Sequence, residues 1–266
     1  MELFTRRTFL KGTLVGIGSV AAFGIAGCSA PAADAPADEG AAASGEGQQA
    51  VSQEPWTFDD QAGNTVTVNV PVQRMVVMQH HSLDMLAQLG MQDKVVGTEK
   101  NWEGDLGDYM RDVFPGIDEL PVPGDLTDWN VEAIAALKPD VVIAASQADP
   151  DAMKQVSDLG IPVVVVSLRG EGKQAEAQNP RLSDADAAYT EGCQWAISTL
   201  GKLTGADQKA GDIWKMCLES RAIVDAAIGQ MDDADRIRVF VANTKDQTYG
   251  NDKYVGCQLL RAGAVN

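Results

Sequence analysis

Continuous apolar runs of strand length are the feature of this 266-residue sequence that most restricts its fold. Residues 74–78, 140–144 and 161–166 are rich in Val, Ile and Met, and segments of helical pattern separate them. A strand that is apolar on both faces is typical of a parallel sheet covered by helices on both sides. We therefore predict an α/β fold for residues 56–185, with a doubly wound parallel sheet.

The remaining elements follow from periodicity and from residues that start or stop helices. Ser82 is expected to cap a helix that Gly90 ends. A long helical pattern covers residues 184–231, and Gly201 and Gly205 are expected to break or bend it. The other expected elements are strands at 66–70, 95–97 and 238–242 and helices at 129–137, 151–159 and 254–260.

Residues 1–28 carry two export motifs. Arg6 and Arg7, followed by Thr-Phe-Leu-Lys, resemble a twin-arginine signal, which a receptor reads. The apolar run after them is too short and too rich in Gly and Ala for a stable membrane span, but it suits a signal peptide. The run ends in Ile-Ala-Gly before Cys28, which resembles a bacterial lipobox. This resemblance implies lipidation of Cys28 and anchoring to the outer face of the cytoplasmic membrane; the alternative is a transmembrane helix with an unmodified cysteine.

Composition narrows the function further. Residues 29–55 are almost all small or polar, so we expect a disordered tether. The formal net charge of −17 and the absence of Lys/Arg clusters argue against binding to nucleic acid. Apart from Cys28, the cysteines are Cys193, Cys217 and Cys257, which form at most one disulfide or remain buried thiols. No Cys/His spacing indicates a metal site, and no intrinsic cofactor is expected.

Three segments together resemble a known family. Residues 131–143 read Val-Glu-Ala-Ile-Ala-Ala-Leu-Lys-Pro-Asp-Val-Val-Ile, residues 93–97 read Asp-Lys-Val-Val-Gly, and residues 159–163 read Leu-Gly-Ile-Pro-Val. They resemble the substrate-binding proteins of ABC importers for iron-siderophore complexes, haem and vitamin B12. The block from leucine through lysine, proline and aspartate into an aliphatic strand is the most specific of them, and the resemblance extends over residues 56–266.

The resemblance implies a fold of two α/β lobes joined by a long helix, with the ligand in the cleft between the lobes. Residues 56–185 would form the amino-terminal lobe, 186–235 the connecting helical region and 236–266 the start of the second lobe. A complete second lobe would need about 100 residues. We therefore expect the carboxy-terminal lobe to be truncated.

The family also implies a function without chemistry. The expected role is a monomeric extracytoplasmic receptor that captures a ferric siderophore, haem or a corrinoid and delivers it to an ABC permease and its ATPase. Two alternatives remain open, a metal-dependent enzyme on a similar fold and a non-functional fragment. The sequence contains no Gly-x-Ser-x-Gly elbow, no HExxH motif and no phosphate loop, which weighs against the enzyme.

Candidate ligand residues follow the predicted strands, because open α/β sheets bind ligands at the carboxyl ends of their strands. His80 and His81, the only histidines, follow the first long strand and can ligate iron or hydrogen-bond a ligand. We prefer His80, because His81 is nearer the expected cap. Trp102 could stack on a ring, Arg169 could pair with an anionic ligand, and Tyr249 could bind from the second lobe. Structural alternatives are a surface or cap-supporting histidine, a packed indole and a solvated arginine.

A further expectation concerns docking to the permease. In the resembled family, a surface glutamate at the position of Glu132 pairs with permease arginines. The alternative is that Glu132 belongs to the polar face of an ordinary amphipathic helix. No direct metal ligand is predicted, although His80 could contact iron held within a chelate.

Overall fold

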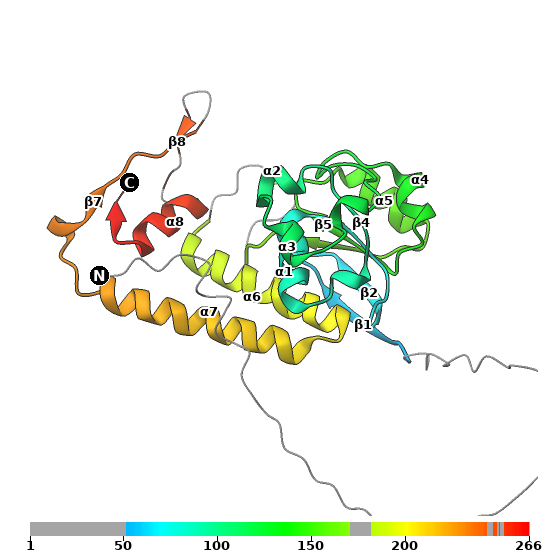
Figure 1. Ribbon diagram of the computed structural model, residues 1–266, viewed down its shortest axis with the longest axis horizontal. Helices are drawn as coiled ribbons and strands as arrows, with labels where there is room; N and C mark the ends of the chain where they lie inside the picture. The colour runs from blue at the N-terminus through cyan, green and yellow to red at the C-terminus, as the bar shows by residue number, and fades with distance from the viewer. Residues whose placement is uncertain (1–51, 171–181, 244–246, 249, 251–252, 266) are drawn as a thin grey trace, which may run out of the picture. The chain divides into compact units, whose positions relative to one another are not determined.

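A four-stranded parallel sheet lies at the centre of the computed structural model, which describes residues 52–170, 182–243, 247–248, 250 and 253–265 (Figure 1). Its strands stand in the order β4-β3-β5-β6, and every neighbouring pair is parallel. The strands are β3 (Met75–Met78), β4 (Val95–Thr98), β5 (Val141–Ala145) and β6 (Val163–Val166). The α/β prediction is therefore confirmed.

Helices cover both faces of this sheet, which explains the unbroken apolar runs. On one face Met75 and Val77 pack with Leu86 of α1 (His80–Leu89) and Leu200 of α6 (Ala185–Thr204). On the other face, residues of β3 and β5 pack with Ile134 of α4 (Val131–Ala136) and with α5 (Pro150–Asp158). The two hydrophobic clusters lie on opposite sides because successive side chains of a strand alternate between its faces.

The start of α1 differs from the prediction. Gln79, in an extended conformation, is the N-cap, and its side chain accepts a hydrogen bond from the Ser82 N–H at 2.5 Å. The expected Ser82 cap is therefore wrong, because the longer Gln79 side chain performs that role and Ser82 is buried in the first turn. Gly90 ends the helix with φ 75°, as predicted. The shift places both histidines inside the helix rather than in a loop.

An antiparallel hairpin precedes the sheet and contacts its edge. The hairpin consists of β1 (Glu54–Asp59) and β2 (Thr65–Val70). At its turn, the buried Asp60 carboxylate accepts the Val165 N–H at 3.0 Å, and the Gln61 N–H donates to the Val165 carbonyl at 3.2 Å. The turn thereby satisfies backbone groups on the outer edge of β6.

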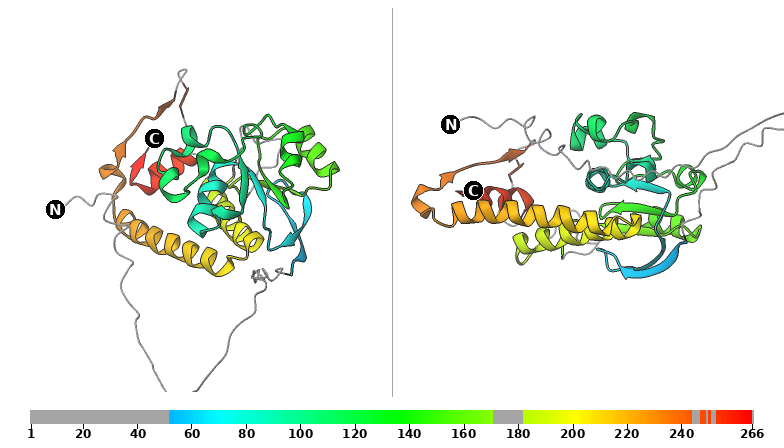
Figure 2. Two further views of the ribbon diagram at one scale, coloured as in Figure 1. Left: turned by 45° about the vertical axis from the view of Figure 1, so that its right-hand side comes forward. Right: turned by 60° about the horizontal axis from the view of Figure 1, so that its bottom comes forward.

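The expected long helical region consists of two antiparallel helices, α6 and α7 (Asp207–Ile228), which lie side by side (Figure 2). Gly205 separates them and has φ 78°, a left-handed conformation that glycine adopts without strain. Arg221 near the end of α7 donates to the Thr190 hydroxyl near the start of α6, at 2.8 Å. Among the described residues, no helix combines the length and apolar character needed to cross a membrane.

The carboxy-terminal segment forms shorter elements than predicted. In place of one strand at 238–242 there are β7 (Ile237–Arg238) and β8 (Ala242–Asn243), and Phe240 between them is 77% exposed. That strand prediction is wrong in extent, because only two-residue pairings are available here. The helix prediction is confirmed by α8 (Tyr254–Arg261). The remaining elements are α2 (Trp102–Leu106), α3 (Met110–Val113), β9 (Gln247–Thr248), β10 (Ala264–Val265) and 3-10 turns at Gln92–Lys94, Ile117–Glu119 and Asp233–Asp235.

Candidate functional site

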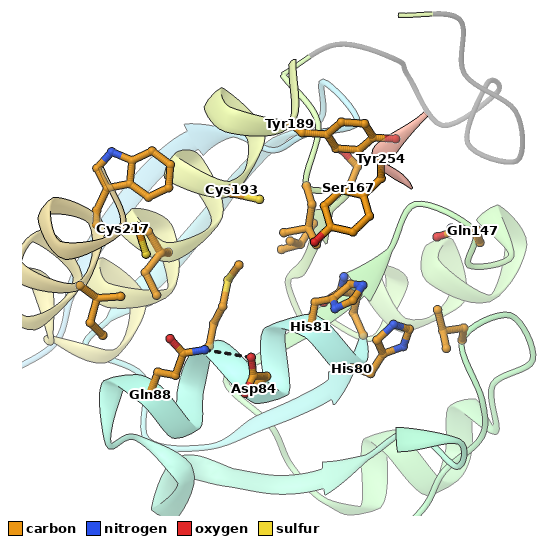
Figure 3. Close-up of a pocket in the computed structure, with 18 residues that line it drawn as sticks. His80, His81, Asp84, Gln88, Gln147, Ser167, Tyr189, Cys193, Cys217 and Tyr254 are labelled. Carbon is orange, nitrogen blue, oxygen red and sulfur yellow. Dashed lines mark hydrogen bonds between the residues drawn. The ribbon is translucent and has the colours of Figure 1, made fainter. Parts of the chain in front are cut away.

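A cavity of about 410 Å³ lies along α1, from the histidines of its first turn to Gln88 near its end, and beside the carboxyl end of β6 (Figure 3). This is the end of the sheet at which the sequence predicted a ligand site. Its walls come from α1, α6, α7, α8 and the loops after β5 and β6. The lining residues include His80, His81, Asp84, Met85, Gln88, Gln147, Ser167, Leu168, Tyr189, Cys193, Ile197, Ile213, Trp214, Cys217 and Tyr254.

Both histidines line this cavity from the first turn of α1. Their ring centroids are 4.3 Å apart, and the rings meet edge to face. The sequence analysis preferred His80 to His81, but both imidazoles line the cavity. Gln79 already accepts the Ser82 N–H, so the first-turn N–H groups of α1 without an intrahelical acceptor are those of His80 and His81.

His80 contacts two carboxylates that do not line the cavity, the buried Glu99 and the exposed Asp105. Its Nδ1 atom lies 3.3 Å from Asp105 Oδ2 and 3.8 Å from Glu99 Oε1. Glu99 directly follows β4, is fully buried, and accepts the Asn101 N–H through Oε2 at 2.5 Å. Burial lowers the pKa of His80, which Asp105 partly offsets, and burial raises the pKa of Glu99.

His81 lies further into the cavity mouth. The protein atoms around its ring and the neighbouring His80 lower the pKa of His81 to about 4, although part of the ring contacts solvent. Its imidazole is therefore neutral at pH 7 and offers one donor and one acceptor. Desolvation acts on His80 in the same direction, so the pair presents little positive charge.

The loop after β6 forms another wall, and the distant hairpin turn fixes it. Gln61 Oε1 accepts the N–H groups of Ser167 and Leu168 at 2.8 and 2.9 Å, and Gln61 Nε2 donates to the Arg169 carbonyl at 3.1 Å. The loop also lies directly against α6 at Gly192, where a Cβ atom would come within 2.2 Å of the Arg169 nitrogen. Only glycine permits this approach.

Arg169 itself is not among the cavity-lining residues. Its side chain is buried, and Nη2 lies 3.4 Å from the Ser146 hydroxyl, at the limit of a hydrogen bond. Burial lowers the pKa of its guanidinium group. Arg169 therefore does not line the cavity with the histidines, and its burial also argues against the solvated alternative.

The other predicted residues lie elsewhere. Trp102 is buried in the hydrophobic core under the guanidinium of Arg111, 5.1 Å from its ring centroid, which fits the packing alternative rather than the stacking role. Glu132 is exposed in the first turn of α4. Tyr249 and Cys28 lie outside the described residues.

The polarity of the cavity is distinctive. No Lys or Arg is among the described residues that line it, and Asp84 is its one carboxylate. That carboxylate accepts hydrogen bonds from Gln88 and from the Tyr109 hydroxyl, both at 2.9 Å. Recognition here would therefore depend on uncharged groups: imidazoles, tyrosine hydroxyls, the amide of Gln147 and the amino-terminal end of α1.

Sequence reasoning missed several residues at the site. Glu99 lies in the loop after β4. Candidate ligand residues were predicted in such loops after strands, but the residue chosen from this one was Trp102. Gln61 and Tyr189 carry no motif, because their positions depend on tertiary contacts between distant segments.

Comparisons with known proteins agree with the fold. Residues 75–251 match the periplasmic binding protein family. The chain is 36% identical over 209 residues to the molybdate-binding protein MolA of Haemophilus influenzae, which covers 78% of this chain and 59% of MolA. It is 35% identical over 108 residues to YfiY of Bacillus subtilis, a probable siderophore-binding lipoprotein; this covers 40% of the chain and 32% of YfiY.

Solved structures give the same result. The molybdate-bound structure of Haemophilus influenzae MolA superposes with a TM-score of 0.73 at 34% identity, covering 79% of this chain and 65% of MolA. The petrobactin-binding protein YclQ of Bacillus subtilis matches in fold, with a TM-score of 0.61 at 21% identity, over 80% of this chain and 66% of YclQ. The chain thus spans about three fifths to two thirds of the length of these proteins. It belongs to the periplasmic binding protein family.

Proposed function

We propose that this chain is the substrate-binding component of an ABC importer and that its ligand is a small oxyanion of the molybdate type. The observation that carries the ligand class is the amino-terminal end of α1, which brings His80 and His81 to the cavity. Backbone donors and the positive end of a helix dipole favour an anion. The molybdate-binding relative, aligned over 78% of this chain, supports the same ligand class.

A ferric chelate is the second candidate. Tyr189, Trp214 and Tyr254 line the cavity, and their rings offer the broad apolar contact that a siderophore or haem needs. The siderophore-binding relative supports this candidate over a shorter alignment. On this alternative, His80 would contact an oxygen of the chelate or the iron within it.

Titration of the purified full chain separates the two candidates. Trp214 lines the cavity, so its fluorescence can report binding, and calorimetry gives the affinity. Molybdate, sulfate and a ferric catecholate siderophore are compared in the same buffer. Saturable binding of molybdate supports the oxyanion proposal. If only the siderophore binds, the ligand is a ferric chelate instead. Failure of all three to bind contradicts the proposal.

Two variants test the histidines. His80→Ala and His81→Ala each remove a hydrogen bond to a charged ligand, worth about 1.5–3 kcal/mol. This corresponds to roughly ten- to 150-fold weaker binding. Glu119→Gln, an exposed carboxylate that does not line the cavity, is the control and should bind like the wild type. If only His81→Ala weakens ligand binding, the hydrogen bond to the ligand comes from His81 and not from His80.

The importer role implies export and docking. Lipidation of Cys28 should hold the protein in the detergent phase of a phase-partition experiment, and Cys28→Ala should move it to the aqueous phase. Glu132, exposed on α4, is the proposed contact to permease arginines. Glu132→Arg should reduce ligand-stimulated ATPase activity in the reconstituted importer without changing ligand affinity.

A further inference from the structure

Three potential metal ligands from separate elements converge beside the cavity: the partly buried His80, the fully buried Glu99 and the exposed Asp105. His80 is the first residue of α1, Glu99 directly follows β4, and Asp105 lies in α2. One ligand atom from each lies within 4.8 Å of the other two. These atoms belong to segments that are 19 and 25 positions from His80, so their meeting is a product of the fold.

Two of these atoms lack partners that their burial demands. Glu99 is fully buried, and its Oε1 atom has no hydrogen-bond partner among the described residues. His80 Nδ1 is also buried without a hydrogen bond of good geometry, although Asp105 lies 3.3 Å away. Buried polar atoms are nearly always satisfied in folded proteins, so an unpartnered carboxylate oxygen that faces an imidazole nitrogen indicates a group that binds between them.

We infer that His80, Glu99 and Asp105 form a binding site for a divalent transition-metal cation, with Zn²⁺ as the type case. Zinc bonds to histidine nitrogen and carboxylate oxygen are about 2.0–2.2 Å long, so two donors at tetrahedral angles lie about 3.4 Å apart. The separations of 3.3 and 3.8 Å from Nδ1 to the two carboxylates fall on either side of that value. One neutral imidazole and two carboxylates also carry the charge that balances a dication.

The neighbouring arginine does not form ion pairs with Glu99 or Asp105, so both carboxylates remain available for the cation. The nearest arginine along α3, Arg111, donates to Glu103 at 2.6 Å and to Asp118 at 2.6 Å. Its ion pairs thus involve carboxylates outside the cluster. Ca²⁺ prefers six to eight oxygen ligands, so an imidazole with two carboxylates favours zinc, cobalt or iron over calcium.

The cation would also determine what His80 offers to the cavity. A cation on Nδ1 leaves the ring proton on Nε2, which makes that nitrogen a hydrogen-bond donor. Without the cation, a proton on Nδ1 facing Asp105 makes Nε2 an acceptor. On the proposed function above, an oxyanion accepts hydrogen bonds, so the metal-bound form of His80 is the one that suits it.

The test begins with metal alone. The full chain is stripped with a chelator, dialysed, and titrated with Zn²⁺ and Co²⁺ under native mass spectrometry, and the visible absorption of Co²⁺ reports its coordination. We expect one cation per chain, and Ca²⁺ at the same concentration should not displace it. Glu99→Gln and Asp105→Asn should each weaken binding at least about tenfold. Asp108→Asn, an exposed carboxylate close to Asp105 in sequence, is the matched control and should bind like the wild type.

The outcomes distinguish this inference from the proposed function, because the metal titration contains no importer ligand. Absence of a stoichiometric cation in the wild type, or equal affinities for Glu99→Gln and Asp108→Asn, overturns the metal site. Circular dichroism of each variant establishes that it is folded. Repeating the molybdate titration with and without Zn²⁺ then tests the link to His80. Tighter molybdate binding with Zn²⁺ supports that link, and unchanged binding overturns it while the metal site stands.

Discussion

The central sheet and the carboxy-terminal segment use similar sequences to different effect. The Val163–Val166 strand has no residue more than 8% exposed, whereas Ile237 in β7 is 72% exposed. β6 pairs along its length with β5, and helices cover both faces of their sheet. β7 pairs over two residues with β10. An apolar run therefore becomes a core strand only where a full-length neighbour and two covering layers exist.

The two regions are also held by different forces. The sheet region depends on apolar burial, but α8 is connected to α6 and α7 by ion pairs. Arg261 Nη1 lies 2.9 Å from an Asp225 oxygen, and both Arg261 and Arg221 pair with Asp186. Such pairs, partly exposed to solvent, contribute about 0–1 kcal/mol each. We expect the second region to open well before the first.

The largest contrast should come from one substitution made in both regions. Ile143, in the central strand β5 next to β3, is fully buried, and Ile143→Ala should lower the free energy of unfolding by about 2–5 kcal/mol through lost burial and a cavity. Ile237→Ala should change it by no more than about 0.5 kcal/mol, because that side chain is mostly exposed. Urea denaturation measures both. Similar decreases in the free energy of unfolding for the two variants would contradict the proposed difference between the two regions.

A smaller effect is expected at the hairpin turn. Asp60→Ala removes the acceptor of the Val165 N–H and of the Ala62 and Asn64 N–H groups. Leaving buried donors unsatisfied should cost about 1–3 kcal/mol. Asp59→Ala, at an exposed neighbour that accepts from the Thr65 hydroxyl, should cost less. Equal midpoints in thermal unfolding for the two variants would show that the hydrogen bonds of Asp60 do not stabilise the fold more than that of Asp59.

The cavity wall should respond less strongly to a change at Gln61. Gln61→Ala removes the acceptor of the Ser167 and Leu168 N–H groups and should loosen the loop after β6. A net loss of about 1 kcal/mol corresponds to roughly fivefold weaker ligand binding. Calorimetry with the ligand identified for the wild type measures it, and Gln73→Ala, at an exposed glutamine away from the cavity, is the control.

The smallest effect concerns the ion pairs of α8. Arg261→Ala should lower the opening free energy of α8 by up to about 1 kcal/mol, with little change in β5. Raising the salt concentration should reproduce part of that loss, because salt screens exposed charges. Hydrogen exchange resolved along the chain provides the measurement. Protection of α8 that is equal to that of β5 and insensitive to salt would refute the ionic attachment.

Much of the sheet region could be predicted from sequence, because local pattern and burial agree there. The strands at residues 140–144 and 161–166 were identified by their apolar runs, and Gly90 and Gly205 mark helix ends as expected. The Ser82 cap was predicted wrongly, because Gln79, three residues earlier, caps the helix. Local signals could not show which groups meet across the fold.

The site illustrates that limit. His80 and His81 line the cavity and Arg169 does not, because the direction of a side chain after a strand depends on packing. Trp102 was considered for its aromatic ring, yet that ring fills the core. Glu99 was missed because an acidic residue after a strand looks like ordinary surface until the fold buries it.

The hairpin turn also affects how folded copies of the protein interact with one another. The outer edge of a sheet is a template on which other chains can add strands and aggregate. The β6 edge is occupied by Asp60 and Gln61, and at the opposite edge the Thr98 N–H donates to the Pro121 carbonyl at 3.0 Å. With backbone groups on both edges engaged by irregular chain, the valine-rich sheet offers fewer free sites for aggregation when many copies are crowded together.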